Sequence, residues 1–261
     1  TMASRVIYLV ANGFVKPDEI LGLTFTRKAA GELSARIRKR LRQLQLAMTK
    51  AGIEVPFATL DTSVTTYHSY AGRLLSEHAI RFGIDADAQP LGEAALWMAA
   101  NTLVRDWNDP DFVYEGALNT AIDDVMGLAS LILEHQVSLD SIRAADEKTL
   151  AELATFSGGP NDEVRAVSRT ARQRIALLPL VERFIETRRG EGTLSFDDQM
   201  SLAADIAMKF PDVAAIERGK YAVVLLDEYQ DTSQSQVRLL SALFGNGHPV
   251  TAVGDPCQSI Y

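Results

Sequence analysis

The stretch Val223-Val224-Leu225-Leu226-Asp227-Glu228-Tyr229-Gln230-Asp231 decides the fold of this chain. Its four leading apolar residues form a short run that is typical of a buried parallel strand. Two adjacent carboxylates, Asp227 and Glu228, follow that run directly. Ligands gather at the carboxyl ends of strands in open α/β sheets, so we expect one carboxylate to hold Mg²⁺ and the other to orient a water molecule. The stretch therefore predicts an α/β fold with half of a nucleotide-hydrolysing site.

The other half of such a site is a glycine-rich phosphate loop that ends in Lys-Ser or Lys-Thr, and these residues contain no such loop. We therefore interpret the chain as part of a larger ATPase and expect the 261-residue chain alone not to hydrolyse ATP. The sequence immediately upstream of Thr1 is the observation that would separate an ATPase from a DNA-binding scaffold with an incomplete site.

Composition excludes several classes of protein. The apolar fraction of 47% is ordinary for a soluble protein, and no apolar stretch approaches the length that spans a bilayer. The single cysteine, Cys257, excludes an internal disulfide and a multi-cysteine metal site. No signal peptide is visible, so we expect a cytoplasmic location without a membrane partner. The net charge of −8 argues against nucleic acid, yet residues 27–42 hold seven basic residues and one acid, which fits either a solvated helix face or a DNA contact.

The chain organises around four expected strands, at residues 20–25, 63–66, 222–226 and 249–253, and each ends in a polar cluster. Four such clusters favour one functional edge on a doubly wound parallel sheet, although strand-end turns are commonly polar. Residues 1–12 and the segment from about Ala29 carry helical apolar stripes, and Gly13 suits a left-handed cap. We expect residues 1–73 and 190–261 to form the α/β domain and residues 74–189 to form an inserted all-helical subdomain.

Five clusters resemble, in order and spacing, the motifs of superfamily-one DNA helicases of the UvrD/Rep/PcrA group. They are residues 24–30 for motif Ia, 66–69 for motif Ib, 195–198 for the Phe-Asp-Asp element, 227–232 for motif II and 253–261 for motif III. The wording of residues 21–28 and 227–232 is most similar to actinobacterial members, including the AdnB type. The resemblance implies a RecA-like P-loop NTPase domain with a helical insertion, clipped at both ends. Motif I would lie just before Thr1, and the chain stops within motif III.

The same resemblance implies an ATP-dependent DNA helicase that uses ATP and Mg²⁺. It implies movement along single-stranded DNA with 3′→5′ polarity, contact with duplex junctions, a role in DNA repair and, for some members, a partner helicase subunit. The fold and the activity implied here are expectations for the whole protein of which this chain forms a part.

Individual residues receive roles from the residues and from the resemblance together. Asp227 is the expected Mg²⁺ ligand and Glu228 the expected base, with an acidic helix cap as the alternative for the pair. By resemblance, Gln258 senses the γ-phosphate; Gln230 bridges the motifs, and Asp255 helps to hold the site together. The expected DNA-contacting residues are Thr24, Phe25, Thr26, Arg27, His68, Ser69 and, by stacking on a base, Tyr261. Core packing is the alternative for Phe25.

Two other readings remain open at this point. A Mg²⁺-dependent nuclease would need Asp227, Glu228, Asp197 and Asp198 to converge on shared metals. A non-catalytic DNA-binding scaffold would need no nucleotide chemistry at all. Ser195 and Asp198 also fit a helix capping box, so the Phe-Asp-Asp element serves either the cap or the ATP site. Much of the basic run at residues 36–42 is expected to be merely solvated, whereas the loop at 24–28 is expected to contact DNA.

Overall fold

The chain, in a computed structural model that describes residues 2–83, 90–110, 112–155 and 161–259, forms two compact units. The α/β unit comprises Thr1–His78 and Leu202–Tyr261, and the helical unit comprises Ala79–Ser201. The sequence placed the corresponding boundaries at 73/74 and 189/190. Tyr261 lies outside the described residues, so its predicted stacking on a base stays a prediction.

The α/β unit is built on a four-stranded parallel sheet with the order β2-β1-β3-β4. The strands are β1 (Ile20–Thr24), β2 (Ser63–Thr66), β3 (Val223–Leu226) and β4 (Val250–Ala252). Strands β1 and β3 are buried along their whole length, which explains why β3 is apolar throughout and β1 is apolar up to Thr24. The α/β fold and the four strands expected from the sequence are confirmed.

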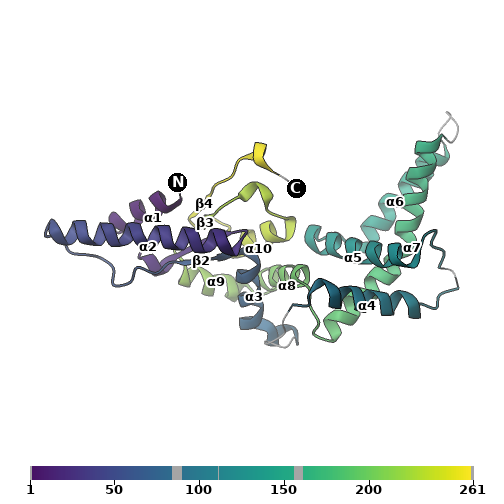
Figure 1. The fold of residues 1–261 in the computed structure, drawn as a ribbon, viewed down its shortest axis with the longest axis horizontal. Coiled ribbons are helices and arrows are strands. Elements are labelled where there is room, and N and C mark those ends of the chain that lie inside the picture. The colour runs from purple at the N-terminus through teal and green to yellow at the C-terminus, as the bar shows by residue number, and fades with distance from the viewer. Residues whose placement is uncertain (1, 84–89, 111, 156–160, 260–261) are drawn as a thin grey trace. The chain divides into compact units, whose positions relative to one another are not determined.

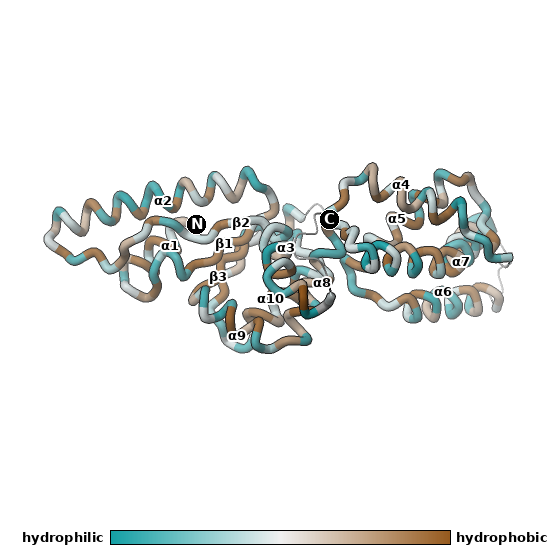
Figure 2. The backbone as a smooth tube through the Cα atoms, turned by 90° about the horizontal axis from the view of Figure 1, so that it is seen from below, coloured by the Kyte–Doolittle hydropathy of each residue, from teal (hydrophilic) through white to brown (hydrophobic). Residues whose placement is uncertain are grey.

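Helices cover this sheet (Figure 1). They are α1 (Met2–Ala11), α2 (Arg27–Lys50), α3 (Tyr67–His78), α9 (Pro211–Lys220) and α10 (Gln234–Phe244), with 3₁₀ turns at Pro17–Glu19, Tyr229–Asp231 and Pro256–Gln258. Val6 of α1 and Ile37 and Leu41 of α2 pack with Ile20 and Leu225 of the sheet. Figure 2 shows β1 and β3 brown, whereas α2 alternates between brown and teal, as expected for a helix with one solvated face.

The helical unit contains α4 (Glu93–Asp106), α5 (Leu118–His135), α6 (Leu139–Ala154) and α7 (Asp162–Gly190), preceded by a 3₁₀ turn at Ala79–Phe82. Its described residues include no strand. Helix α8 (Phe196–Lys209) begins in this unit and ends in the α/β unit. Residues 79–201 hold 11 of the 26 Lys and Arg residues but 21 of the 34 Asp and Glu residues, so this unit carries ten more acids than bases.

The start of α8 is fixed by a buried polar cluster. Ser195 Oγ accepts the Asp198 N–H at 3.0 Å, and Asp198 Oδ2 accepts the Ser195 N–H at 2.9 Å, so the predicted capping box is confirmed. Arg188, at the end of α7, forms an ion pair with Asp198 at 2.5 Å, and its guanidinium lies 4.2 Å from the centre of the Phe184 ring. The side chains of Arg188 and Asp198 are 3% and 0% exposed, so both charges are removed from water.

Candidate nucleotide and nucleic-acid site

The predicted site residues gather at one edge of the sheet, because the carboxyl ends of parallel strands share an edge. The predicted nucleotide residues follow β3 and β4, and the predicted DNA residues that the structure describes lie at or after the ends of β1 and β2. Strands β1 and β3 are neighbours in the sheet. The chain continues from β1 to β2 on one side of this pair and from β3 to β4 on the other side. This is the topological switch point at which doubly wound sheets place their ligands.

The backbone at Asp227 and Glu228 is held from two sides. The Asp227 N–H donates to the Leu23 carbonyl of β1 at 2.9 Å, and the Tyr67 hydroxyl of α3 donates to the Asp227 carbonyl at 3.1 Å. Glu228 has φ +54° and ψ +38°, a left-handed conformation that costs a non-glycine residue about 1–2 kcal/mol. One hydrogen bond contributes about 0.5–1.5 kcal/mol, so the Tyr67 bond is of the size needed to offset this strain.

The electrostatics of the acidic pair fit a hard cation. The pKa of the Asp227 carboxyl is raised, first because the group is partly buried and second because Glu228 carries a like charge. Among the described residues, no Lys or Arg forms an ion pair with either carboxylate. Mg²⁺ takes one or two protein carboxylates and completes its shell with water and phosphate oxygens, so this donor set fits the ion.

A chain of hydrogen bonds connects four of the predicted residues. Gln230 Nε2 donates to Glu228 Oε2 at 2.8 Å and to Asp231 Oδ2 at 3.1 Å. Gln230 Oε1 accepts the Asp255 N–H at 3.0 Å, and Gln258 Nε2 donates to Asp255 Oδ2 at 2.8 Å. The side chains of Glu228 and Gln258 are exposed, as groups that meet a ligand must be. The bridging contact predicted for Gln230 is therefore present, while its role in catalysis stays a prediction.

Gly254 makes this chain possible because it has no side chain. A Cβ at this position would lie 2.6 Å from Gln230 Oε1 and 3.0 Å from the Gln230 backbone nitrogen. The neighbouring strand end is tied down, since the Tyr229 N–H donates to the Val253 carbonyl at 2.9 Å. The backbone therefore cannot move away without breaking a bond.

The substitution Gly254→Ala is expected to destabilise the protein and to detach Gln230 from Asp255. Overpacking of this kind costs about 1–3 kcal/mol. For a domain of this size that lowers the midpoint of thermal unfolding by roughly 2–10 °C, measurable by calorimetry. Gly31→Ala is the matched control, because a Cβ on Gly31 meets nothing within 4 Å. A Gly254→Ala protein as stable as the Gly31→Ala protein would contradict the close packing described.

The predicted DNA residues differ in their accessibility. Thr24 is 1% exposed, and its hydroxyl has no hydrogen-bond partner among the described residues, which weighs against a direct DNA contact. Thr26 caps α2 by accepting the Ala29 N–H at 3.1 Å. This cap explains why α2 begins at Arg27 rather than near residue 29, so Arg27 and Lys28 are exposed in its first turn.

The residues that follow β2 pack against those that follow β1. The Phe25 and Tyr67 rings lie 5.0 Å apart at 54°, so Phe25 takes part in packing, and its predicted DNA contact stays a prediction. Ser69 is exposed; its N–H donates to Thr66 Oγ1 at 3.1 Å, and its Oγ accepts the Thr66 hydroxyl at 2.8 Å. His68 is partly buried.

The five basic residues between positions 36 and 42 of α2 are exposed, and two of them also make contacts on the protein surface. Arg38 forms an ion pair with Asp61 at 2.7 Å, and Arg40 donates to Ser4 Oγ at 2.7 Å. These charges are occupied in local contacts on the protein surface.

The nuclease hypothesis finds no support at this edge. Asp198 is committed to Arg188 and Ser195, and Asp197 Oδ2 accepts the Ser130 hydroxyl at 2.6 Å. Within residues 2–83, 90–110, 112–155 and 161–259, no group of three or more His, Cys, Asp or Glu side chains is arranged to hold a metal ion.

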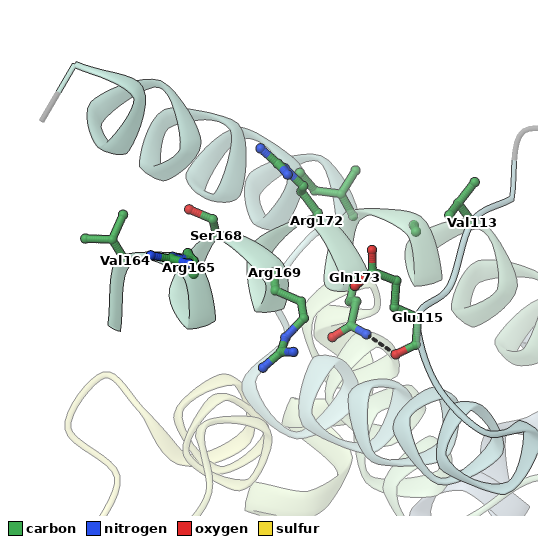
Figure 3. A pocket seen from close by; sticks show the side chains of 10 residues that line it. Val113, Glu115, Val164, Arg165, Ser168, Arg169, Arg172 and Gln173 are labelled. Carbon is green, nitrogen blue, oxygen red and sulfur yellow. Dashed lines mark hydrogen bonds between the residues drawn. The ribbon is translucent and has the colours of Figure 1, made fainter. Parts of the chain in front are cut away.

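A cavity of about 690 Å³ lies elsewhere, in the helical unit. Arg165, Arg169 and Arg172 of α7 line it, and Gln173 Nε2 donates to the Glu115 carbonyl at 2.7 Å across one side (Figure 3). Figure 3 shows the guanidinium groups of Arg169 and Arg172 pointing in different directions. None of the predicted site residues lines this cavity, so volume alone does not identify the chemistry of the chain.

None of the helices in the described ranges is both long enough and apolar enough to cross a lipid bilayer.

Sequence reasoning missed three features of the site: Tyr67, the left-handed Glu228 and the space left by Gly254. Tyr67 lies inside the motif at residues 66–69, and Gly254 lies inside the motif at residues 253–261. A glycine directly after an expected strand indicates that another segment of backbone passes close by, so the sequence did contain a signal for Gly254. No local pattern signals a glutamate with positive φ.

Comparison with known proteins gives a consistent result. The sequence profile of the UvrD/REP helicase N-terminal domain matches residues 1–261. The chain is 29% identical over 264 residues to "ATP-dependent DNA helicase UvrD2" of Mycobacterium tuberculosis, covering 100% of the chain and 33% of the relative. It is 26% identical over 269 residues to "ATP-dependent DNA helicase PcrA" of Leuconostoc citreum, covering 29% of that protein. The chain thus spans about a third of the length of these relatives.

Proposed function

The chain belongs to the UvrD/REP helicase N-terminal domain family, and from this premise we propose that its protein is an ATP-dependent DNA helicase. The α/β unit is proposed as the RecA-like motor domain and the helical unit as its insertion. The observation that carries the proposal is the chain of hydrogen bonds from Glu228 through Gln230 and Asp255 to Gln258, beside the acidic pair at the sheet edge.

The proposed roles follow from position and charge. Asp227 would hold Mg²⁺, and the bound ion would neutralise charge on the phosphates of ATP. Glu228 orients the attacking water and accepts its proton, because its carboxylate is exposed at the strand end. Gln258 reaches the γ-phosphate and is joined through Asp255 and Gln230 to Glu228, so nucleotide state and the base respond together.

Single-stranded DNA is the proposed polymer substrate, with Phe25, Thr26, Arg27, His68 and Ser69 as contacts. Arg27 and Lys28 occupy the first turn of α2, and that turn contains no acid. Cations there oppose the helix dipole by about 0.3–1 kcal/mol each, and a bound phosphate would reverse this penalty. Thr24 is buried, so its contribution would be indirect. Tyr261 keeps its proposed stacking role.

Replacing Arg27 and Lys28 together by alanine in the full-length protein is expected to weaken single-strand binding and to flatten its salt dependence. Each lost phosphate contact lowers the slope of log K against log salt by about 0.7, so the pair lowers it by about 1.4. Fluorescence anisotropy at several salt concentrations measures this slope. Arg38→Ala with Arg42→Ala is the control with equal charge loss, because Arg38 is engaged with Asp61. Equal slope changes in both double variants would refute the division of roles.

The polarity and the wider partners are part of the same proposal. We propose 3′→5′ movement, contact with duplex junctions, a cytoplasmic location and a partner helicase subunit. The test is unwinding by the full-length protein with ATP and Mg²⁺, using duplexes with a 3′ or a 5′ single-stranded tail. Unwinding that requires ATP and the 3′ tail supports the proposal, whereas DNA binding without ATP turnover supports a scaffold.

A further inference from the structure

We infer that Tyr67 is a positioning residue that couples DNA occupancy at the ends of β1 and β2 to the carboxylates after β3. This inference rests on the proposed function and assigns a role to a side chain that does not itself meet ATP. Tyr67 is 2% exposed and begins α3, and its hydroxyl reaches the carbonyl of Asp227 at 3.1 Å.

The peptide group between Asp227 and Glu228 is the element on which Tyr67 acts. The carbonyl of Asp227 and the N–H of Glu228 belong to one rigid plane. Glu228 has φ +54°, and a return to negative φ with rotation of this plane carries the Asp227 carbonyl away from the Tyr67 hydroxyl. The Asp227 N–H stays anchored to Leu23 at 2.9 Å, so rotation is confined to this one peptide. The Tyr67 hydroxyl therefore stabilises the observed arrangement of this peptide over the rotated one.

The other side of Tyr67 faces the proposed DNA contacts. Its ring lies 5.0 Å from the Phe25 ring, and His68 and Ser69 follow it directly in α3. A DNA strand that displaces Phe25 or the first turn of α3 therefore displaces Tyr67 and alters its hydrogen bond to Asp227. Nucleotide binding at Asp227 and Glu228 alters the same hydrogen bond by displacing its acceptor, the Asp227 carbonyl. Coupling of binding free energies through a shared element is reciprocal.

The test uses Tyr67→Phe in the full-length protein, since this change removes only the hydroxyl. Tyr70→Phe is the matched control: Tyr70 lies on the same helix, is 1% exposed and donates instead to Glu217 Oε2 at 2.8 Å. The dissociation constant for single-stranded DNA is measured with and without a non-hydrolysable ATP analogue. The stimulation of ATP turnover by DNA is measured in parallel.

Two ratios are compared: the DNA dissociation constant without and with the analogue, and ATP turnover with and without DNA. For Tyr67→Phe we expect each ratio to fall by about threefold to tenfold. For Tyr70→Phe we expect both ratios to match the wild type, even if the loss of the bond to buried Glu217 lowers thermal stability. Phe25→Leu is the second variant and is expected to reduce both ratios if Tyr67→Phe does not fold. Unchanged ratios in a folded Tyr67→Phe protein, or equal losses in Tyr70→Phe, overturn the inference alone. A wild type without ATP turnover or DNA binding overturns the proposed function and this inference together.

Discussion

A full-length protein carrying Glu228→Gln is expected to bind ATP nearly as tightly as the wild type and to turn it over at least about 100-fold more slowly. An amide keeps the shape of the side chain and removes the base, and general bases contribute about 10²–10⁴ to rate. The Gln230 contact at 2.8 Å still finds an oxygen on the new amide, so the loop geometry is preserved. Steady-state phosphate release and equilibrium binding of a fluorescent ATP analogue measure the two quantities separately.

Glu54→Gln is the matched control for this prediction, because it makes the same chemical change at an exposed position outside the site. Its turnover should equal that of the wild type. Equal loss of ATP binding and turnover in a folded Glu228→Gln protein would count against the role given to Glu228, since it would point to a general disturbance of the loop.

Asp198→Ala is expected to cost about 3–5 kcal/mol of stability, because it leaves the Arg188 charge buried without a partner. The change also removes the capping contact to Ser195. Both tryptophans of the chain, Trp97 and Trp107, lie in the helical unit, so unfolding in urea followed by tryptophan fluorescence reports on this unit.

Two further variants separate the buried pair from ordinary surface charges. Glu152→Ala breaks the exposed contact between Lys148 and Glu152 at 3.9 Å and should cost less than about 1 kcal/mol. The double variant Arg188→Met with Asp198→Leu should recover part of the loss, because no unpaired charge remains. A single Asp198→Ala variant as stable as Glu152→Ala would show that the ion pair is not buried in solution.

The strands and the acidic pair were predictable because they depend on local sequence. Residues 20–23 and 222–226 contain no polar side chain, as a strand buried on both faces requires. The capping box of Ser195 and Asp198 was also predictable, since its partners are three residues apart. Its third member, Arg188, was not, because it arrives from the end of a different helix.

The remaining features of the site depend on contacts between distant segments. The Tyr67 hydroxyl donates to the Asp227 carbonyl, 160 residues away in the sequence. This hydrogen bond helps to stabilise the positive φ of Glu228. The sequence did not distinguish the buried Thr24 from its neighbours in the motif. Successive side chains of a strand face opposite sides, and the sequence does not show which side is covered. The pairing of Arg38 with Asp61 likewise spans 23 residues, and both side chains remain exposed.

The uneven distribution of acids between the two units has a kinetic consequence. The helical unit carries ten more acids than bases, whereas the α/β unit holds 15 Lys and Arg against 13 Asp and Glu. A polyanion that diffuses toward the protein is repelled by the acidic helical unit but not by the α/β unit, whose charges nearly balance. Encounters with the helical unit are therefore brief. Because this repulsion acts over a Debye length of about 8 Å at physiological salt, moderate salt should accelerate non-specific collisions with the helical unit. The same salt should slow capture at the first turn of α2.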